Sequence, residues 1–448
     1  MRKVLILGGA TFATLLVTCF VWIQFPRVSD PQFVQQTVID GQNYFAQGQV
    51  NALEKGKNGY LRPEFLPYWG RKGQEYVAKS PTELLVKGWN LYSTAAQAKT
   101  VDHRHLQVSK DSAYLKARQS FESLAPALES AFRSETFVAP ETRFDYDTMT
   151  MNFIALRSCA QAMTGFAESE MAAGNTDRAA SSLGSLFTLC QALQQKGPLI
   201  NEMIVCAIAS NATAETLALV TPKTQMSAQS WKALAGDILT SVPHKDRMFP
   251  LMVGEMSCAK LFFSGLRNNR QLSANSASNL GISTSGLYIP GVLAREERIF
   301  DNVHTRLLKG LQQTGSVSLN SADLNPTAID YFLGQSGVMV QLMLPNMEGI
   351  SQRLDLDRRL RTVTATVYAA LAFRAEHGRL AKNLVELTSK YPVPEDNQSL
   401  GLEYKVKDSG ATVHIPYGEA QRFLESTEEF PGLASWVRVE NDGLSFRL

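Results

Sequence analysis

The first hydrophobic pattern along the chain is an uninterrupted apolar run near the amino terminus. It extends from Val4 to Phe25 without a charged residue, directly after Arg2 and Lys3. A helix rises 1.5 Å per residue, so a run of this length crosses a hydrocarbon core of roughly 30 Å. Basic residues favour the cytoplasmic side, and no Ala-x-Ala cleavage site follows the run. We therefore expect an uncleaved signal anchor, with a cytoplasmic tail over residues 1–3 and the rest of the chain in the periplasm. The alternative is cleavage of the segment, including lipoprotein processing at Cys19.

Further along, apolar positions recur with the period of an α-helix. The pattern predicts four consecutive helices, over residues 147–173, 176–196, 199–220 and 227–242. Gly174 supplies the left-handed conformation that ends the first helix, and Thr176 or Asp177 is predicted to cap the second. Ser227 is predicted to cap the fourth. Because the links are short, neighbouring helices are expected to pack antiparallel.

The junction between the first two of these helices resembles that of tetratricopeptide-like helical hairpins. It reads Glu-Met-Ala-Ala-Gly-Asn over residues 170–175 and is followed by Ala179. No period near 34 residues recurs along the chain. The resemblance therefore implies an antiparallel array of helical hairpins and not a regular repeat protein.

Near the carboxy terminus the spacing of hydrophobic positions changes from about 3.6 residues, which is typical of a helix, to 2 residues, which is typical of a strand. Residues 351–378 predict one long helix that ends at Gly378, and residues 384–387 predict a short second helix. Alternation over residues 402–416 and 436–448, each interrupted by an Asp/Gly turn, predicts two β-hairpins. We therefore expect a long helix packed on a small antiparallel sheet.

This pattern resembles the pseudopilin-like helix–hairpin module of uncharacterised planctomycete-type envelope proteins that combine an N-terminal anchor, a helical array and such a module. The resemblance rests on residues 369–380, on the Asn-Leu-Val-Glu-Leu motif over residues 383–387, and on a proline-rich crossing before a strand centred on Tyr404. The family's proline after the Gly-Arg pair and its Asp-Pro-Phe turn are missing here. The resemblance implies a fold and no activity.

Together these patterns predict a mainly α protein. Residues 26–80 are predicted as an irregular linker region, residues 81–345 as an antiparallel helical-hairpin array (tetratricopeptide-like), and residues 346–448 as a small α+β pseudopilin-like domain. Further helices are predicted from Pro81 and over residues 110–134 and 293–311. The polar stretch over residues 271–290 is predicted as an exposed loop.

Charge and cysteine content narrow the range of partners. The chain has 44 basic and 42 acidic residues, a net charge of +2 and no basic run, so nucleic acid is not an expected partner.

Four cysteines lie in predicted helices: Cys159, Cys190, Cys206 and Cys258. A free buried cysteine behaves as a small hydrophobe. A disulfide of Cys190 with Cys159 or Cys206 is the alternative in an oxidising compartment.

The histidines do not predict a metal site. His103 and His105 alternate as on a strand, but two ligands do not close a site and the arginine between them would repel the ion. His377 is explained by the end of the long helix, where its charge suits the helix dipole. His244 and His304 stand alone in the sequence. No metal and no cofactor are therefore predicted.

The strongest catalytic motif is the Ser-x-x-Lys spacing of Ser257 and Lys260. It would place a lysine one helical turn from a serine nucleophile, but the Ser-Asp-Asn and Lys-Thr-Gly motifs that accompany it do not occur in the sequence. The acidic residues 296–297, and likewise Asp355 and Asp357, lie among arginines and predict solvated helix faces with ion pairs. No catalytic residue is predicted.

The favoured interpretation is a membrane-anchored envelope protein without catalytic activity, whose helical array offers a groove to a protein partner. The alternative is an envelope hydrolase whose residues converge only in the fold. A pocket that gathers Ser257 with His244 or His304 and an acidic residue would favour the enzyme. A groove that lacks them would favour binding.

Overall fold

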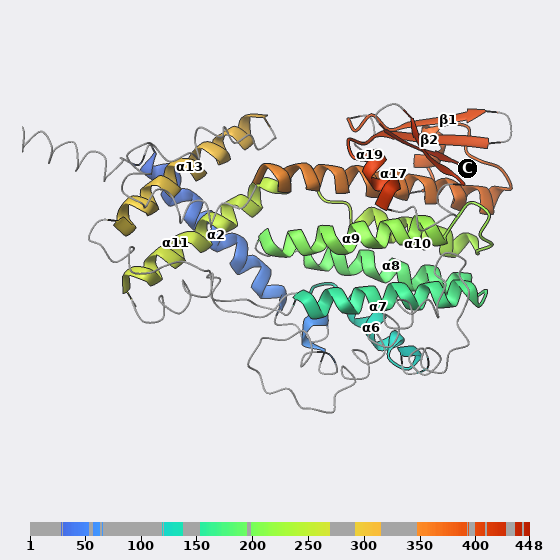
Figure 1. Ribbon diagram of the computed structural model, residues 1–448, viewed down its shortest axis with the longest axis horizontal. Helices are drawn as coiled ribbons and strands as arrows, with labels where there is room; N and C mark the ends of the chain where they lie inside the picture. The colour runs from blue at the N-terminus through green and yellow to red at the C-terminus, as the bar shows by residue number, and fades with distance from the viewer. Residues whose placement is uncertain are drawn as a thin grey trace, which may run out of the picture. The chain divides into compact units, whose positions relative to one another are not determined.

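The chain divides into two compact units (Figure 1). The computed structural model describes residues 28, 30–52, 57–62, 65, 119, 121–137, 153–194, 199–268, 292–314, 347–391, 393, 399–407, 410–426, 435–440 and 443–448. Over these residues the protein is mainly helical with one four-stranded antiparallel sheet, which confirms the predicted fold class at this level. Unit 1 comprises Met1–Ala46, Thr142–Thr148 and Asp246–Ser351, and unit 2 comprises Gln47–Glu141, Met149–Lys245 and Gln352–Leu448.

Several sequence-based predictions concern residues outside the described part. These are the apolar run over residues 4–25, the helix from Pro81, His103, His105 and the stretch over residues 271–290. Among the described residues, no helix combines the length and the apolar character needed to cross a membrane. The anchor therefore stays a prediction.

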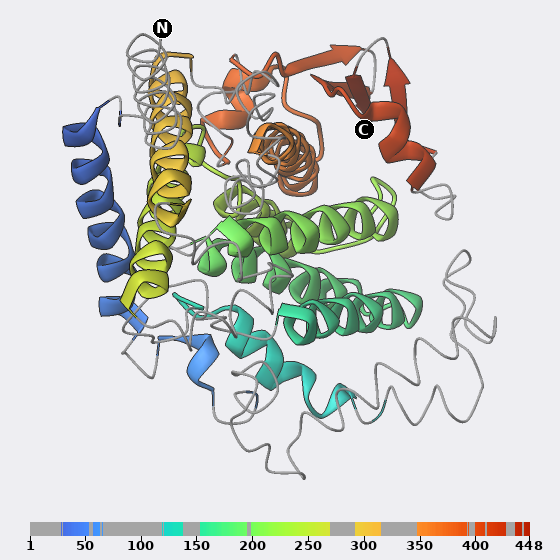
Figure 2. The same cartoon turned by 60° about the vertical axis from the view of Figure 1, so that its left-hand side comes forward.

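The described part of unit 1 contains most of α2 (Pro31–Ala52), together with α11 (Met248–Asn268) and α13 (Val292–Thr314), and Figure 2 shows these three helices side by side. Gly41 lets α2 approach α11 closely, because a Cβ at this position would lie 2.5 Å from the Cβ of Ser257. Helix α11 packs on α13 through Phe263 and Phe300, whose ring centroids lie 5.8 Å apart. Helix α13 corresponds to the helix predicted over residues 293–311.

Helices α6, α7, α9 and α10 of unit 2 pack around α8. Their bounds are α6 (Ala125–Phe132), α7 (Phe153–Ala172), α8 (Thr176–Leu193), α9 (Leu199–Leu219) and α10 (Ala228–Thr240), with a 3-10 helix η1 (Gly59–Leu61) packed on α6. Helix α8 packs against all four of the other α-helices (Figure 1). The four predicted helices are thus present as α7 to α10, and α8 lies at their centre.

The junction between α7 and α8 has the predicted glycine but a different cap. Gly174 adopts φ = +82°, the left-handed conformation expected of it. The cap of α8 is Asn175 and not Thr176 or Asp177. Thr176 instead donates to a backbone carbonyl before α10 (2.6 Å), and Asp177 accepts from the backbone N–H of Ser227 (3.0 Å), so both tie the two segments together. Ser227 caps α10 as predicted, by accepting the backbone N–H three residues further on.

The carboxy-terminal part consists of a long helix and a sheet. The elements are α17 (Met347–His377), α18 (Leu384–Thr388), β1 (Glu403–Lys407), β2 (Gly410–Pro416), α19 (Ala420–Ser426), β3 (Val437–Glu440) and β4 (Gly443–Arg447). The strand order is β1-β2-β4-β3, and β1–β2 and β3–β4 are the two predicted hairpins. Gly378 ends α17 with φ = +69°, as predicted. Helix α19 was not predicted.

One hydrophobic core joins α6 to α10 with α17 and the sheet. Tyr368 of α17 is fully buried, and its hydroxyl donates toward the carbonyl oxygens of Thr216 and Val220 (2.9 and 3.0 Å) at the end of α9. Trp231 of α10 stacks on the same ring, with centroids 5.7 Å apart. Helix α17 therefore lies between α9 and α10 on one side and the sheet on the other (Figure 1), and it carries one wall of the groove described below.

Candidate functional site

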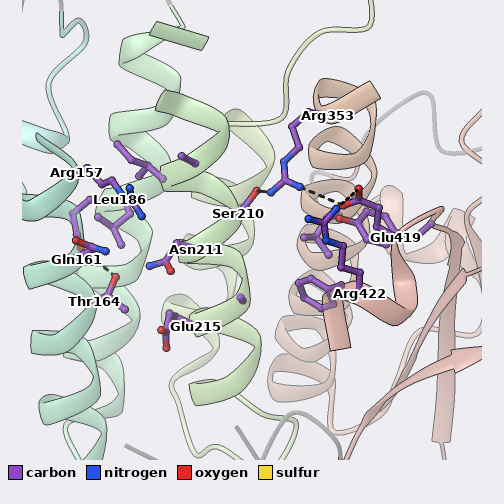
Figure 3. A pocket seen from close by; sticks show the side chains of 17 residues that line it. Arg157, Gln161, Thr164, Leu186, Ser210, Asn211, Glu215, Arg353, Glu419 and Arg422 are labelled. Carbon is purple, nitrogen blue, oxygen red and sulfur yellow. Dashed lines mark hydrogen bonds and ion pairs between the residues drawn. The ribbon is translucent and has the colours of Figure 1, made fainter. Parts of the chain in front are cut away.

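A polar groove of about 400 Å³ lies in unit 2 (Figure 3). Its walls are faces of α7 and α9, with Leu186 of α8, and further residues come from α17 and from the segment of α19. Volumes of this size are typical of sites that hold a small molecule or a few residues of a peptide. The groove is therefore the candidate functional site of the described chain.

Identical spacing on two helices forms the two main walls. Helix α7 contributes residues 157, 160, 161 and 164, and α9 contributes residues 207, 210, 211 and 214. Residues at i, i+3, i+4 and i+7 share one face of a helix. Three of these eight positions are alanine, at 160, 207 and 214, so the space between the helices stays open.

The wall next to α17 is an ionic network. The Glu419 carboxylate pairs with Arg353 (3.3 Å) and with Arg422 (3.4 Å). Arg353 also donates to the hydroxyl of Ser210 on α9 (3.2 Å), which ties α17 to the middle of the groove. Figure 3 shows this network on the side of α9 that faces α17. These charges satisfy one another and hold the wall in place.

The wall formed by α7 has unused hydrogen-bonding capacity. Among the described residues, Arg157, Gln161 and Asn211 form no hydrogen bond or ion pair. Figure 3 shows Arg157 and Gln161 on α7 and the Asn211 side chain extending from α9 toward them. A guanidinium and two amides in one groove can bind a carboxylate and the polar groups of a peptide backbone.

Apolar residues close the groove on the side of the sheet. Tyr417 is buried and packs edge-on against Phe423, with ring centroids 6.1 Å apart. Burial raises the pKa of the Tyr417 hydroxyl to about 12, so it stays protonated at physiological pH. Leu360 of α17 adds a further apolar contact. The groove thus offers an apolar end and a polar, partly charged face.

The motif Ser257 and Lys260 lies in unit 1 and does not line the groove. Ser257 is fully buried against α2. Lys260 pairs with Glu297 (2.5 Å) and with Asp301 (2.9 Å) of α13. The lysine is therefore held by two carboxylates and is not poised as a base beside the serine.

No histidine forms a hydrogen bond with Ser257, because the serine hydroxyl has no hydrogen-bond partner among the described residues. His304 is buried in α13 with its ring centroid 4.5 Å from that of Phe300, and burial lowers its pKa to about 3, so it is neutral at physiological pH. His377 is the last residue of α17 and stacks on Phe373 (4.2 Å), in agreement with its predicted role at the helix end. His244 is exposed in the turn after α10.

The prediction of solvated acidic faces is wrong for three of the four residues. Asp355 is half-buried and pairs with Arg359 (2.7 Å) as expected. Asp357 is fully buried and pairs with Arg361, while Glu296 and Glu297 are also buried. The predicted ion pairs therefore exist, but these carboxylates lie on packed helix faces. Of their cationic partners, Arg361 is fully buried, whereas Arg267 is exposed.

Neither a reactive cysteine nor a metal-binding cluster is found among the described residues. The four cysteines Cys159, Cys190, Cys206 and Cys258 are free and buried. Burial raises the pKa values of the first three thiols, which makes these groups poor nucleophiles and poor metal ligands. No group of histidine, cysteine and acidic residues in the described ranges could hold a metal ion.

Sequence reasoning missed the groove residues. The available signal was the polar pair Arg157 and Gln161, four residues apart on a helix that is otherwise rich in alanine, methionine and leucine, together with Asn211 on α9. Such interruptions mark the face of a helix that does not enter the core.

No family model matches the sequence, and comparisons with curated proteins and with solved structures found no match.

Proposed function

We propose that the chain is a membrane-anchored envelope protein that binds another protein in the groove of unit 2 and acts as a scaffold without catalysing a reaction. The observation that carries this proposal is the groove itself, because its polar groups Arg157, Gln161 and Asn211 have no partner among the described residues. Unpaired donors in a preformed groove are available to a partner's backbone and side chains.

The hydroxyls of the groove support binding over hydrolysis. The Ser210 hydroxyl accepts a hydrogen bond from Arg353, and the Thr164 hydroxyl donates to the carbonyl of Ala160 (3.2 Å). A serine nucleophile needs a neighbouring base that takes its proton. Neither hydroxyl has one among the described groove residues.

We further propose that α7 to α10 form a tetratricopeptide-like array and that α17 and the sheet form a pseudopilin-like module. The first part is supported by the hairpin of α7 and α8 and by the parallel course of α7 and α9, whose inner faces line a groove. The second part is supported by a long helix that shares a core with two antiparallel hairpins.

The membrane topology has its own test. A periplasm-dependent phosphatase fused after Leu448 should be active, and a reporter that works only in the cytoplasm should be silent at the same position. Recovery of the amino-terminal peptide from membranes at full mass would support an uncleaved anchor. The opposite reporter pattern would reverse the proposed orientation.

Site-specific photocrosslinking tests the binding role. A photoreactive amino acid is placed at Ala207, which is exposed and lines the groove, and at Gln229, which is exposed on α10 outside it. Irradiation of intact membranes should give a reproducible crosslinked protein from position 207 and not from position 229. Equal crosslinking at both positions, or none at either, would refute protein binding in the groove.

A further inference from the structure

The groove has a direction because its charges differ from end to end. Figure 3 shows Arg157 and Ser210 toward one end of the groove, and Thr164 and Glu215 toward the other. Arg157 marks the first end and Glu215 lines the other (Figure 3). An anionic group is therefore attracted at the end of the groove that Arg157 marks.

The length of this polar face fits a short extended peptide. Seven residues separate Arg157 from Thr164, which corresponds to about 10 Å along a helix. An extended chain advances about 3.3 Å per residue, so about three to four residues fit along this face. Gln161 and Asn211 lie between the two ends, where a peptide backbone would present its N–H and C=O groups.

Among the groove residues that the structure describes, Arg157 carries the cationic charge that is free to bind. Arg353 and Arg422 are both paired with Glu419 and cannot attract an anion as strongly as Arg157, which has no ion pair among the described residues. Arg157 is also exposed, so a partner can reach it. A carboxylate can accept two parallel hydrogen bonds from a guanidinium, which favours an acidic side chain as its partner.

We infer that the groove binds an extended segment of a partner protein, with one acidic side chain paired to Arg157 and the peptide backbone bonded to Gln161 and Asn211. This inference rests on the proposed function and specifies the chemistry of the partner.

The test uses the purified full chain in detergent and phage-displayed random octapeptides. We expect selected peptides to share Asp or Glu at one position. Loss of the charge-assisted bonds in Arg157→Gln should weaken binding of a synthetic selected peptide by about 10- to 100-fold. Replacing the peptide's acidic residue by the matching amide should weaken binding to the unmodified chain by a similar factor.

Two controls separate the groove from general charge effects. Arg438→Gln removes an exposed arginine on β3 that does not line the groove, and it should leave the dissociation constant unchanged. Arg157→Glu should reject the acidic peptide and accept its lysine counterpart. A selection without acidic preference, a selection without binders, or equal affinity of Arg157→Gln and the unmodified chain would overturn the inference.

The two proposals fail in different ways. If the groove position 207 crosslinks a protein and Arg157→Gln leaves that crosslink unchanged, the protein-binding function stands and the acidic anchor is wrong. If position 207 gives no specific crosslink, the binding function itself is wrong.

Discussion

The buried pair of Asp357 and Arg361 tests the packing that positions the groove. Both side chains are fully buried in α17, one helical turn apart, and Arg361 also donates to the backbone carbonyl of Ser241 after α10. The perturbation is Arg361→Met, which keeps the length of the side chain and removes its charge. It leaves the Asp357 carboxylate in the core without its cation.

The expected cost follows from this burial. Removing one partner of a buried ion pair costs about 3–5 kcal/mol. For a unit of this size, that loss lowers Tm by about 10 °C. The double variant Asp357→Leu, Arg361→Met leaves no buried charge, and the main remaining loss is the hydrogen bond to the Ser241 carbonyl, about 1–3 kcal/mol. The double variant should therefore be more stable than Arg361→Met alone.

The pH dependence of the single variant provides a second measurement. Burial raises the pKa of the Asp357 carboxyl, and the Arg361 guanidinium opposes this shift. Without Arg361, the carboxyl should bind a proton in the folded state at higher pH than in the unfolded state. Arg361→Met should therefore regain stability relative to the unmodified chain as the pH falls from 7 toward 5.

Thermal unfolding of the full chain in mild detergent, followed by circular dichroism, measures these differences. Arg361→Met, Asp357→Leu, the double variant and the unmodified chain are compared at pH 7 and pH 5 as a double-mutant cycle. A double variant that is less stable than Arg361→Met, or a single variant without pH dependence, would refute the reasoning.

Three further changes test other parts of the fold. The hydrogen bond from Arg379 lowers the pKa of the Glu386 carboxyl to about 2. The ionised carboxylate therefore stabilises the folded state at pH values above its ordinary pKa, and this contribution is lost as the pH falls toward 2. Glu386→Gln should lower Tm at pH 7 and have no effect near pH 2; equal effects at both values would contradict this. Gly174→Ala should lower the free energy of unfolding by about 1 kcal/mol, because φ = +82° strains a residue that has a Cβ. No atom lies within 4 Å of the added Cβ, so no clash contributes to this loss. Unfolding curves of the two chains would show the difference. Ser257→Ala should leave Tm unchanged or raise it, because the Ser257 hydroxyl has no hydrogen-bond partner among the described residues; a clear fall in Tm would contradict this.

Local signals in the sequence predicted local structure well. Gly174, Gly378 and Ser227 act at helix ends, where the required backbone conformation or cap depends on a few neighbouring residues. The two hairpins were predicted for the same reason, since alternation and a short turn determine which strands pair. Helix α8 is an exception, because Thr176 and Asp177 bond to the segment before α10 instead of capping their own helix.

Features that depend on distant packing were not predictable in the same way. Asp357 follows a half-buried acidic residue, Asp355, by two positions, and only the packing of α17 against α10 shows that Asp357 is fully buried. Helix α2 lies within a segment predicted as irregular, and its close approach to α11 requires Gly41 and Ser257 to meet. The groove depends on how α7 and α9 are turned about their axes, which their own periodicity does not specify.

The central claim is that a partner protein occupies the groove, and blocking the groove tests it most directly. Ala207→Trp places a large side chain at an exposed position of the groove wall, and Ala233→Trp places the same side chain at an exposed position of α10 outside it. The measurement is the amount of partner that copurifies with the tagged full chain after crosslinking in cells. The account predicts that Ala207→Trp reduces this amount to background while Ala233→Trp leaves it unchanged. Equal recovery with both variants would contradict it.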